Sequence, residues 1–521
     1  MTRLQLGGRS GRGNAAPFIT VLAILLITSG CASVPLDTPK EPSYAVASTA
    51  NSEGALNTRR WLDGRDDVSG FYPLAEGFDA FGARLRLIDL ASVSIDAQYF
   101  LMKPDDAGFT FLAKLLEAAD RGVRVRLLLD DVFTTMDDVY LGVLDVHPNV
   151  EVRIFNPISR KGIYAFNYLG HFSLLNRRMH NKAFIADNLL AIVGGRNIAV
   201  EYFQLETSGE FLDFDMLSAG TIVPEVSAQF DTYWNHTLAV PIDLLYDEDN
   251  VEELNAARSS LDRQMAEAGN SIYGRATTTP LMEQFLAREV SPFIAEGRLI
   301  ADEPQKLLEK VSRERQIVVT ELGKVLAEAE DTIYIFTPYF IPRKSGVEFI
   351  RGLRGKGVRV IILTNSLATN NHTPVHSSYS SYRKELLRAG VELWEARADA
   401  AKITTPEGET ELEKLTLHTK GLIIDDDMVF VGSLNLDPRS IDINTEMGML
   451  IRSPELVAKM TDQAAENIAA IAYRLELDEN DRIVWRAMVN GQEVVETKEP
   501  QTSGWQRFTA WFLKILPESQ L

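Results

Sequence analysis

The chain has 521 residues, of which 45% are hydrophobic, so it can bury a sizeable core in two similar halves. Its formal net charge is −20. Because binding to a phosphate backbone relies on clustered lysine and arginine, this charge argues against a nucleic-acid substrate, although it leaves room for a local basic groove.

Residues 1–30 have the layout of an export signal, with three arginines before the apolar run Pro17 to Ile27. This run is too short to span a bilayer permanently. The small residues before Cys31, the only cysteine, resemble the end of a bacterial lipoprotein signal, with Thr28 in place of the usual leucine. We expect a diacylated Cys31 at the membrane of the bacterial cell envelope, facing the periplasm. By resemblance to such lipoproteins, the alanine that follows is compatible with the outer membrane, and an uncleaved signal anchor is the alternative. Residues 31–58, rich in Pro, Ser and Thr, are expected to form a flexible tether.

Two stretches of the chain share one order of predicted elements. SIDAQYFLMKPDDAGFTFLAKLLEAADRGVRVRLLL and TIYIFTPYFIPRKSGVEFIRGLRGKGVRVIILT both read as strand, Tyr-Phe, loop, amphipathic helix and strand. The first belongs to an expected repeat at 59–243 and the second to one at 325–475. Such alternation predicts an α/β fold, with a mainly parallel sheet flanked by helices in each repeat, and the two repeats packed about a pseudo-twofold axis.

Tyr99 and Tyr339 end the first strand of their repeats near the expected cleft. They are candidates for substrate contact, although packing under a loop is at least as good an interpretation.

The pattern His-x-Lys-x4-Asp occurs once in each repeat, in MHNKAFIADNLLAIVGGRN and LHTKGLIIDDDMVFVGSLN. The two stretches agree through the glycine turn and the asparagine that follows. Since residues i and i+2 of a strand share a face, each copy places an imidazole beside a fixed ammonium group. The residues concerned are His180, Lys182, Asp187 and Asn197 in the first copy, and His418, Lys420, Asp425 and Asn435 in the second.

A site with two imidazoles and two ammonium groups suits a phosphodiester. Lysine and amide groups can hold the non-bridging oxygens, where charge develops during displacement at phosphorus. One histidine can attack while the other handles protons. Zinc is the rival for paired histidines, but a lysine two residues away opposes a cation, so we expect neither a metal nor another cofactor.

Three other regions carry expectations. Residues 244–324, rich in Glu, Asp, Ala and Arg, are expected to form a mostly helical connector. Within the C-terminal extension 476–521, residues 503–516 have aromatic and apolar residues at helical spacing. They are expected to form an amphipathic helix that lies in a membrane interface or, equally, docks on the core of the protein. His376, in PVHSSYSSYRKELLRAGVELWE, is a further candidate for substrate binding.

These residues resemble those of the phospholipase D superfamily, and from about Trp61 onward the chain is similar to its bacterial cardiolipin synthases. NRRMHNKAFIADNLLAIVGGRNIAVEYF and DPRSIDINTEMGMLI are most similar to the C-type enzymes. The resemblance implies a covalent phosphohistidine on His180, with His418 as general acid and then base. It also implies that Lys182, Lys420, Asn197 and Asn435 bind the phosphoryl oxygens.

The resemblance further implies a carboxylate downstream of each motif that orients a histidine. Aligning EFLDFDML with NTEMGML puts Asp213 opposite Glu446, with Asp215 as the alternative to Asp213. Asp187 and Asp425 are then structural residues that hold the motif strands.

The implied function is cardiolipin synthesis on phospholipid substrates, in which a phosphatidyl group is transferred to phosphatidylglycerol. The first interpretation has phosphatidylethanolamine as the donor, and the second has phosphatidylglycerol as the donor. The alternative is a phospholipase D-type phosphodiesterase that hydrolyses phospholipid or, less favoured, nucleic acid. A non-catalytic lipid-binding lipoprotein is a third class. The oligomeric state stays open.

Overall fold

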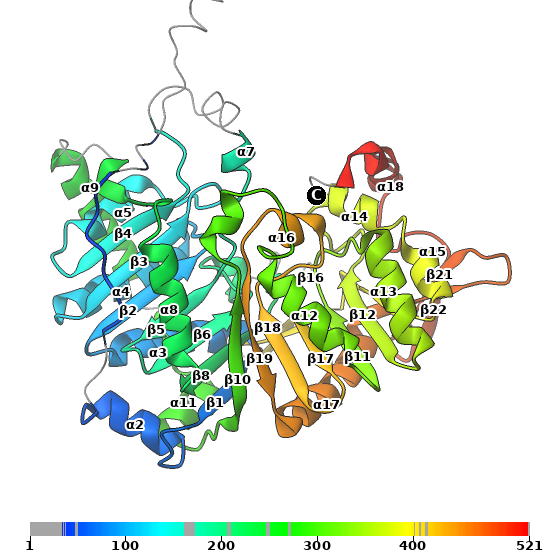
Figure 1. Ribbon diagram of the computed structural model, residues 1–521, viewed down its shortest axis with the longest axis horizontal. Coiled ribbons are helices and arrows are strands. Elements are labelled where there is room, and N and C mark those ends of the chain that lie inside the picture. The colour runs from blue at the N-terminus through cyan, green and yellow to red at the C-terminus, as the bar shows by residue number, and fades with distance from the viewer. Residues whose placement is uncertain are drawn as a thin grey trace, which may run out of the picture.

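The computed structural model describes residues 34, 36, 38–46, 50–160, 172–205, 210–245, 251–268, 272–400, 402–405, 408–411 and 415–518 (Figure 1). The predicted signal peptide and Cys31 lie outside these residues. The predicted α/β fold is confirmed, since helices flank a sheet of 18 strands. Within the described part of the chain, no helix is both long and apolar enough to cross a membrane.

The first half of the sheet has the strand order β9-β4-β3-β2-β5-β6-β8-β1. Its β2–β3 and β3–β4 pairs are parallel and the others are antiparallel. Its elements are α2 (Glu53–Trp61), β1 (Ser69–Leu74), α3 (Gly77–Leu90), β2 (Ser94–Tyr99), α4 (Asp106–Asp120), β3 (Arg124–Asp130), α5 (Asp138–Asp145), β4 (Val150–Phe155), α7 (Phe172–Leu175), β5 (Ala183–Ala186), β6 (Leu190–Gly194), η1 (Val200–Tyr202), β7 (Glu210–Leu212), β8 (Asp215–Gly220), α8 (Val223–Trp234), β9 (Ala239–Pro241) and η2 (Ile242–Leu244).

The second half repeats this order as β13-β12-β11-β17-β18-β19 and adds β20-β21-β22 beside β13. Its β11–β12 and β12–β13 pairs are parallel. Its elements are α12 (Ile317–Ala327), β11 (Thr332–Phe336), α13 (Arg343–Gly355), β12 (Arg359–Asn365), α14 (Thr373–Tyr379), α15 (Arg383–Arg388), β13 (Glu392–Ala396), β14 (Lys402–Thr405), β15 (Gly408–Glu411), β16 (Leu415–Leu417), β17 (Gly421–Ile424), β18 (Met428–Gly432), α16 (Pro438–Asp442), β19 (Met447–Arg452), α17 (Pro454–Ile471), β20 (Ala472–Leu477), β21 (Ile483–Val489), β22 (Gln492–Glu496), α18 (Gly504–Phe512) and η5 (Leu513–Ile515).

The sheet is thus mixed, with a parallel centre in each half, rather than mainly parallel throughout. The β-α-β units that the sequence predicted supply the parallel pairs. Each motif strand instead returns through a tight turn, which requires an antiparallel neighbour. Asp187 and Asn188 form the first turn with φ of 55° and 54°, and Asp425 has a φ of 52° in the second.

The segment between the halves contains a strand as well as helices. The helices α9 (Val251–Ala268), α10 (Gly274–Thr277) and α11 (Pro280–Ala287) precede β10 (Phe293–Ala301), which η4 (Pro304–Leu307) follows. β10 pairs with β1 through Phe293–Ala295 and with β19 through Glu296–Ala301, so it joins the two halves into one sheet (Figure 1). The expectation of a mostly helical connector misses β10, because this strand depends on partners that lie far away in the sequence.

The core runs across the boundary between the halves. One cluster of buried apolar side chains includes Met179 and Val193 from the first half with Val431 and Met447 from the second. The halves therefore share a packed apolar interface, which fixes the side chains of one half against those of the other.

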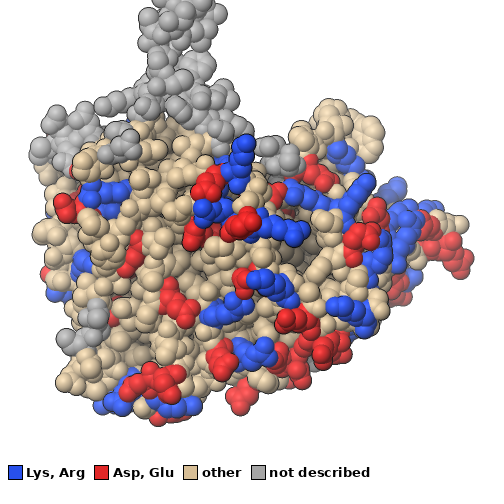
Figure 2. All heavy atoms as spheres, viewed as in Figure 1, with Lys and Arg blue, Asp and Glu red and all other residues tan. Residues whose placement is uncertain are grey.

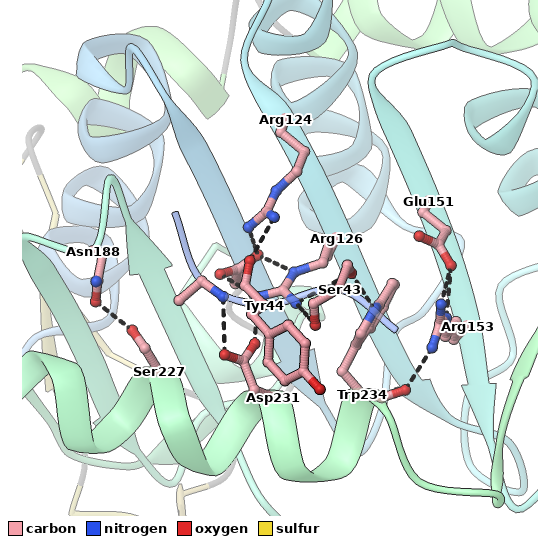
Figure 3. Close-up of polar contacts among 12 residues, drawn as sticks. Ser43, Tyr44, Arg124, Arg126, Glu151, Arg153, Asn188, Ser227, Asp231 and Trp234 are labelled. Carbon is pink, nitrogen blue, oxygen red and sulfur yellow. Dashed lines mark hydrogen bonds and ion pairs between the residues drawn. The ribbon is translucent and has the colours of Figure 1, made fainter. Parts of the chain in front are cut away.

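Part of the predicted tether is bound to the body of the protein. Residues 38–46 run across β3 and β4, where Arg124, Arg126 and Arg153 donate hydrogen bonds of 2.7 to 3.0 Å to backbone carbonyls of this segment (Figure 3). Within 31–58, these described residues are therefore not a flexible tether. Their composition suggested flexibility, but the arginine donors satisfy their backbone groups.

Candidate active site

Each motif histidine is held by the backbone of the opposite half. The His180 amide donates to the carbonyl of Thr445 at 3.0 Å, beside a bridge between Met179 and Thr445. The His418 amide donates to the carbonyl of Leu212 at 2.7 Å, because β16 runs parallel to β7. Both histidines are buried, with 6% of each exposed. The two motifs therefore meet at the interface between the halves.

A carboxylate from the opposite half lies against each imidazole. Oε2 of Glu446 is 2.8 Å from Nδ1 of His180, and Oδ2 of Asp213 is 2.5 Å from Nδ1 of His418. When Nδ1 carries the proton and donates to the carboxylate, Nε2 keeps its lone pair. Asp215, the alternative to Asp213, lies elsewhere and pairs with Arg84 at 2.9 Å.

The two carboxylates are supported differently. The Ser433 hydroxyl donates to Oε2 of Glu446 at 2.5 Å. The corresponding residue of the first repeat is Gly195, where an added Cβ would lie 2.1 Å from Oδ1 of Asp213. Glu446 thus has a hydroxyl group as its hydrogen-bond partner. Asp213 instead lies so close to Gly195 that there is no room for a side chain at that position. The sequence assigned both positions only to a small-residue turn.

The motif lysines are buried beside their histidines. Nζ of Lys182 donates to the carbonyl of His180 at 2.7 Å, and Nζ of Lys420 lies 2.8 Å from Nδ1 of His418. Burial lowers the pKa of Lys182 to about 7 and that of Lys420 to about 8. An anion that approached would favour the charged ammonium form, so both lysines are suited to binding a phosphoryl group.

Asn197 and Asn435 occupy equivalent positions, and each has a buried Oδ1 without a hydrogen-bond partner in the structure. A buried amide atom of this kind costs free energy unless a ligand satisfies it. A flip of the amide would present its N–H groups instead, and these could donate to phosphoryl oxygens.

Burial lowers the pKa of His180 to about 4 and that of His418 to about 3. Glu446 and Asp213 oppose these shifts, whereas Lys182 and Lys420 each lower the pKa of both histidines. The charged groups of the two motifs therefore act on one another as a single cluster. At neutral pH both imidazoles are neutral, and the lone pair of a neutral imidazole is available for nucleophilic attack.

Burial also raises the pKa of Asp213 and of Glu446, but the charges and hydrogen bonds of the neighbouring lysines and histidines outweigh it and leave both pKa values below the usual range. Lys420 and then His418 act on Asp213, and His180 acts first on Glu446. Both carboxylates are therefore ionised at neutral pH and can stabilise an imidazolium.

Aromatic rings enclose the histidines. The ring of Phe100 is 4.7 Å from that of His180, while Phe211 stacks on His418 at 5.0 Å and Tyr202 meets it edge-on at 5.1 Å. The motifs in the sequence did not indicate these three residues. The Tyr-Phe pair at the end of β2 is the feature of the sequence that could have indicated a role for Phe100 in the site.

Of the two tyrosine candidates, only Tyr339 adjoins the site. Its ring is 6.5 Å from that of His418, and its hydroxyl donates to Oδ1 of Asn371 at 2.6 Å. Tyr99 is fully buried and its hydroxyl accepts from Arg84 at 3.0 Å, so it belongs to the core. Successive strand residues point to opposite faces, which explains why Phe100 and not Tyr99 reaches the histidine.

His376 is also placed away from the motif histidines. It is buried in α14, where its Nε2 lies 3.1 Å from Nη2 of Arg383 and 3.6 Å from Oε1 of Glu499. These contacts give His376 a place in an internal polar network instead of one in the site.

The motif aspartates bind backbone amides. Oδ1 of Asp187 accepts from the amides of Val93 and Ser94 at 2.7 and 3.0 Å. Oδ1 of Asp425 accepts from the amides of Asp331 and Thr332 at 2.8 and 3.0 Å. Each aspartate thus ties the end of its motif strand to the start of the neighbouring antiparallel strand, which is β2 for Asp187 and β11 for Asp425. Among the residues that the structure describes, no group of three or more His, Cys, Asp or Glu side chains could hold a metal ion.

Comparisons with known proteins show the family of the chain. A family model described as "Cardiolipin synthase, PLD-like domain" matches residues 85–234 and 322–468. The chain is 36% identical over 450 residues to cardiolipin synthase C of Escherichia coli K12, a match that covers 86% of this chain and 95% of that protein. It is 31% identical over 521 residues to an uncharacterized protein of Helicobacter pylori J99, covering 97% and 99% of the two chains.

Among solved structures, a phosphatidylserine synthase of Haemophilus influenzae Rd KW20 matches with a TM-score of 0.53. The match covers 81% of this chain and 92% of that one at 14% sequence identity. At this identity the likeness shows a shared fold alone.

Proposed function

Because this chain is a phosphatidyltransferase that belongs to the cardiolipin synthase family of phospholipase D-like proteins, we propose that it makes cardiolipin from two phospholipids. The observation that carries this proposal is the pair of crossed contacts, Glu446 with His180 and Asp213 with His418. Two oriented histidines with a buried lysine beside each are what a two-step transfer at phosphorus needs. We further propose that 59–243 and 325–475 are the catalytic repeats, joined by 244–324.

In the first step, Nε2 of His180 attacks the phosphorus of the donor lipid. The bond from phosphorus to the headgroup oxygen breaks, and His418 gives that oxygen a proton. The products are a phosphatidyl group on His180 and a free alcohol, which is ethanolamine when the donor is phosphatidylethanolamine. His418 must be protonated at this stage, and the negative charges of Asp213 and of the donor phosphate both favour that form.

In the second step, the primary hydroxyl of phosphatidylglycerol attacks the same phosphorus. His418 takes the proton of that hydroxyl as the new oxygen–phosphorus bond forms, and the bond to His180 breaks. The product is cardiolipin, and both histidines return to their starting state. Two in-line displacements predict retained configuration at phosphorus. Lys182, Lys420, Asn197 and Asn435 hold the phosphoryl oxygens in both steps.

The enclosure of the site supports transfer over hydrolysis. His180 and His418 are largely buried, and the rings of Phe100, Phe211 and Tyr202 pack against them. Apolar walls lower the local concentration of water, which competes with the lipid hydroxyl for the intermediate. The same groups would act as a phospholipase D if water reached the phosphatidyl-histidine.

We propose that the protein is attached to a membrane of the bacterial envelope through a lipidated Cys31 and faces the periplasm, with the outer membrane as the favoured one. Five positions separate Cys31 from Leu36, which already packs against the buried apolar cluster that both halves share. A chain of that length spans at most about 18 Å. Such an anchor would keep the first half close to the bilayer.

The test is a lipid assay with the purified protein in mixed vesicles. Labelled phosphatidylethanolamine and phosphatidylglycerol are supplied singly and together, and products are read by mass spectrometry. Cardiolipin formed only from the mixture, with ethanolamine released, supports the proposed donor. Cardiolipin from phosphatidylglycerol alone shifts the donor to that lipid. Phosphatidic acid alone identifies a phospholipase D, and no lipid product rejects the proposal.

A further inference from the structure

We infer that the C-terminal aromatic face, made of Trp505, Phe508, Trp511, Phe512 and Ile515 on α18 and η5, docks on the surface of an anionic phospholipid bilayer. This docking goes beyond the proposed reaction, since the face is separate from the catalytic groups. It places the mouth of the site against the bilayer that holds the substrates.

The C-terminal aromatic face is a continuous exposed surface. Its five side chains are between 50% and 73% exposed, and the only buried residue of α18 is Ala510. Phe508 lies at its centre, with ring centroids 5.5 Å from Trp505, 5.9 Å from Trp511 and 6.5 Å from Phe512. Large apolar patches of this kind on a protein surface mark sites of interaction.

The composition of this segment favours a bilayer interface over a protein partner. Tryptophan prefers the headgroup level of a membrane, where its ring is buried and its N–H is hydrated. From Gly504 to Leu516 the only charged residues are Arg507 and Lys514, while the whole chain carries −20. A cationic apolar segment on an acidic protein is complementary to anionic headgroups. Figure 2 shows a protrusion at the upper right that is mostly tan, the colour of residues other than Lys, Arg, Asp and Glu.

The segment is mounted firmly on the second half. The Ser377 hydroxyl donates to the carbonyl of Ala510, and the Glu518 carboxylate accepts from Ser378 at 3.0 Å and Tyr382 at 2.8 Å. Before α18, the Glu499 carboxylate accepts from Arg383. These contacts fix α18 against α14 and α15 on both of its sides. A fixed helix can orient the whole enzyme on a membrane, which a loose tail cannot do.

The helix α14, against which α18 packs, is connected by contacts to the catalytic site. α14 begins after Asn371 and His372, and both residues contact Tyr339, which in turn adjoins His418. On the other side of the site, the 41% exposed Phe133 packs on Phe100 at 5.0 Å, and Phe100 packs on His180. Apolar surface therefore flanks both motif histidines. Figure 1 shows α18 at the same end of the molecule as α7 and α16, which lie next to the motifs in sequence.

The test measures vesicle binding by the chain expressed without the signal residues 1–30 and with Cys31→Ser, so that neither the apolar run of the signal nor a lipid anchor can bind in place of the C-terminal aromatic face. The variant Trp505→Glu/Trp511→Glu carries charge on the C-terminal aromatic face. The matched control is Leu286→Glu on α11, a 58% exposed apolar residue at the opposite end of the molecule. Binding to vesicles of phosphatidylethanolamine and phosphatidylglycerol is measured by co-sedimentation. Thermal unfolding checks that all variants fold.

We expect the double variant to bind these vesicles at least tenfold more weakly than the parent, and the control to bind within twofold of it. Equal binding by the double variant overturns the inference. A second result would also overturn it: the parent is a dimer in solution, and the double variant is a monomer that binds vesicles as well as the parent does. In that case a second copy of the chain covers the C-terminal aromatic face. Vesicle binding without any cardiolipin formation would leave this inference standing and reject the proposed reaction.

Discussion

The carboxylate of Glu446 lies 2.8 Å from Nδ1 of His180, although 266 positions separate the two residues in the chain. Asp213 and His418 form the reciprocal contact across 205 positions. Each half of the protein thus orients the histidine of the other half. Because both contacts cross the interface, the site exists only when the two halves are packed together.

Because Asp213 contacts His418 and Glu446 contacts His180, substitutions of the two carboxylates should impair different steps of the reaction. Asp213→Asn should impair proton transfer by His418, and Glu446→Gln should impair attack by His180, each by about 10²- to 10⁴-fold in kcat. A phosphodiester with a good leaving group needs no proton from His418 in the first step. We therefore expect such a substrate to restore the first-step burst for Asp213→Asn and not for Glu446→Gln. The reverse pattern in burst kinetics would exchange the roles of the two histidines.

Substitution of the histidines themselves should separate the two steps. His180→Ala should abolish transfer and hydrolysis together, since no nucleophile remains. His418→Ala should still form the covalent phosphatidyl-histidine from a donor with a good leaving group and then stall, because the acceptor hydroxyl is not deprotonated. Trapping the labelled intermediate on a denaturing gel at neutral to alkaline pH measures this, because the phosphorus–nitrogen bond of a phosphohistidine hydrolyses in acid. Activity that survives in His180→Ala but is lost in His418→Ala contradicts the assignment.

The pH dependence should follow the lowered pKa values of the buried groups. His180, with a pKa of about 4, should stay neutral and reactive well below pH 6. On the alkaline side, Lys182 and Lys420 lose their charge near pH 7 and 8 in the free enzyme, so kcat/KM should fall as the pH rises through this range. A bound phosphate anion favours the ammonium forms, so the alkaline limb of kcat should lie at higher pH. Coincident alkaline limbs would show that the lysines do not contact the phosphate.

Glu446 accepts a hydrogen bond from Ser433, whereas Asp213 lies against Gly195. Substitutions at Ser433 and Gly195 should therefore lower kcat by different factors. Ser433→Ala removes one hydrogen bond to an ionised group, worth about 1.5 to 3 kcal/mol, and should lower kcat by about tenfold or more. Gly195→Ala places a methyl group 2.1 Å from Oδ1 of Asp213, so the carboxylate must move. A displacement of about 1 Å costs roughly a hundredfold in rate. Steady-state kinetics should therefore rank Gly195→Ala below Ser433→Ala.

The motif aspartates should affect stability more than chemistry. Asp187→Ala removes the acceptor of several backbone amides and should lower the free energy of unfolding by about 2 to 3 kcal/mol. Asp425→Ala should cost less, because Asp425 is only half-buried whereas Asp187 is buried. Urea denaturation of both variants gives these values. A loss of activity in a variant of unchanged stability would point to a direct role in the site.

The repeats and the chemistry that they offer can be predicted from the amino-acid sequence. Two copies of His-x-Lys-x4-Asp, the i and i+2 spacing of His180 and Lys182, and the β-α-β order around them are local patterns. The period of a strand or helix fixes which side chains share a face, so these patterns can be interpreted without a partner. The family was recognised from the same local stretches, and that recognition is confirmed.

Which groups meet depends on how the two halves fold together. That Glu446 serves His180, that Phe100 and not Tyr99 reaches it, and that β10 joins the two halves all depend on pairing between distant segments. Residues 38–46 look like a tether in composition, yet arginines on β3 and β4 hold them. Local periodicity cannot specify such contacts, because their free energy comes from burial and hydrogen bonding that exist only once the halves have packed.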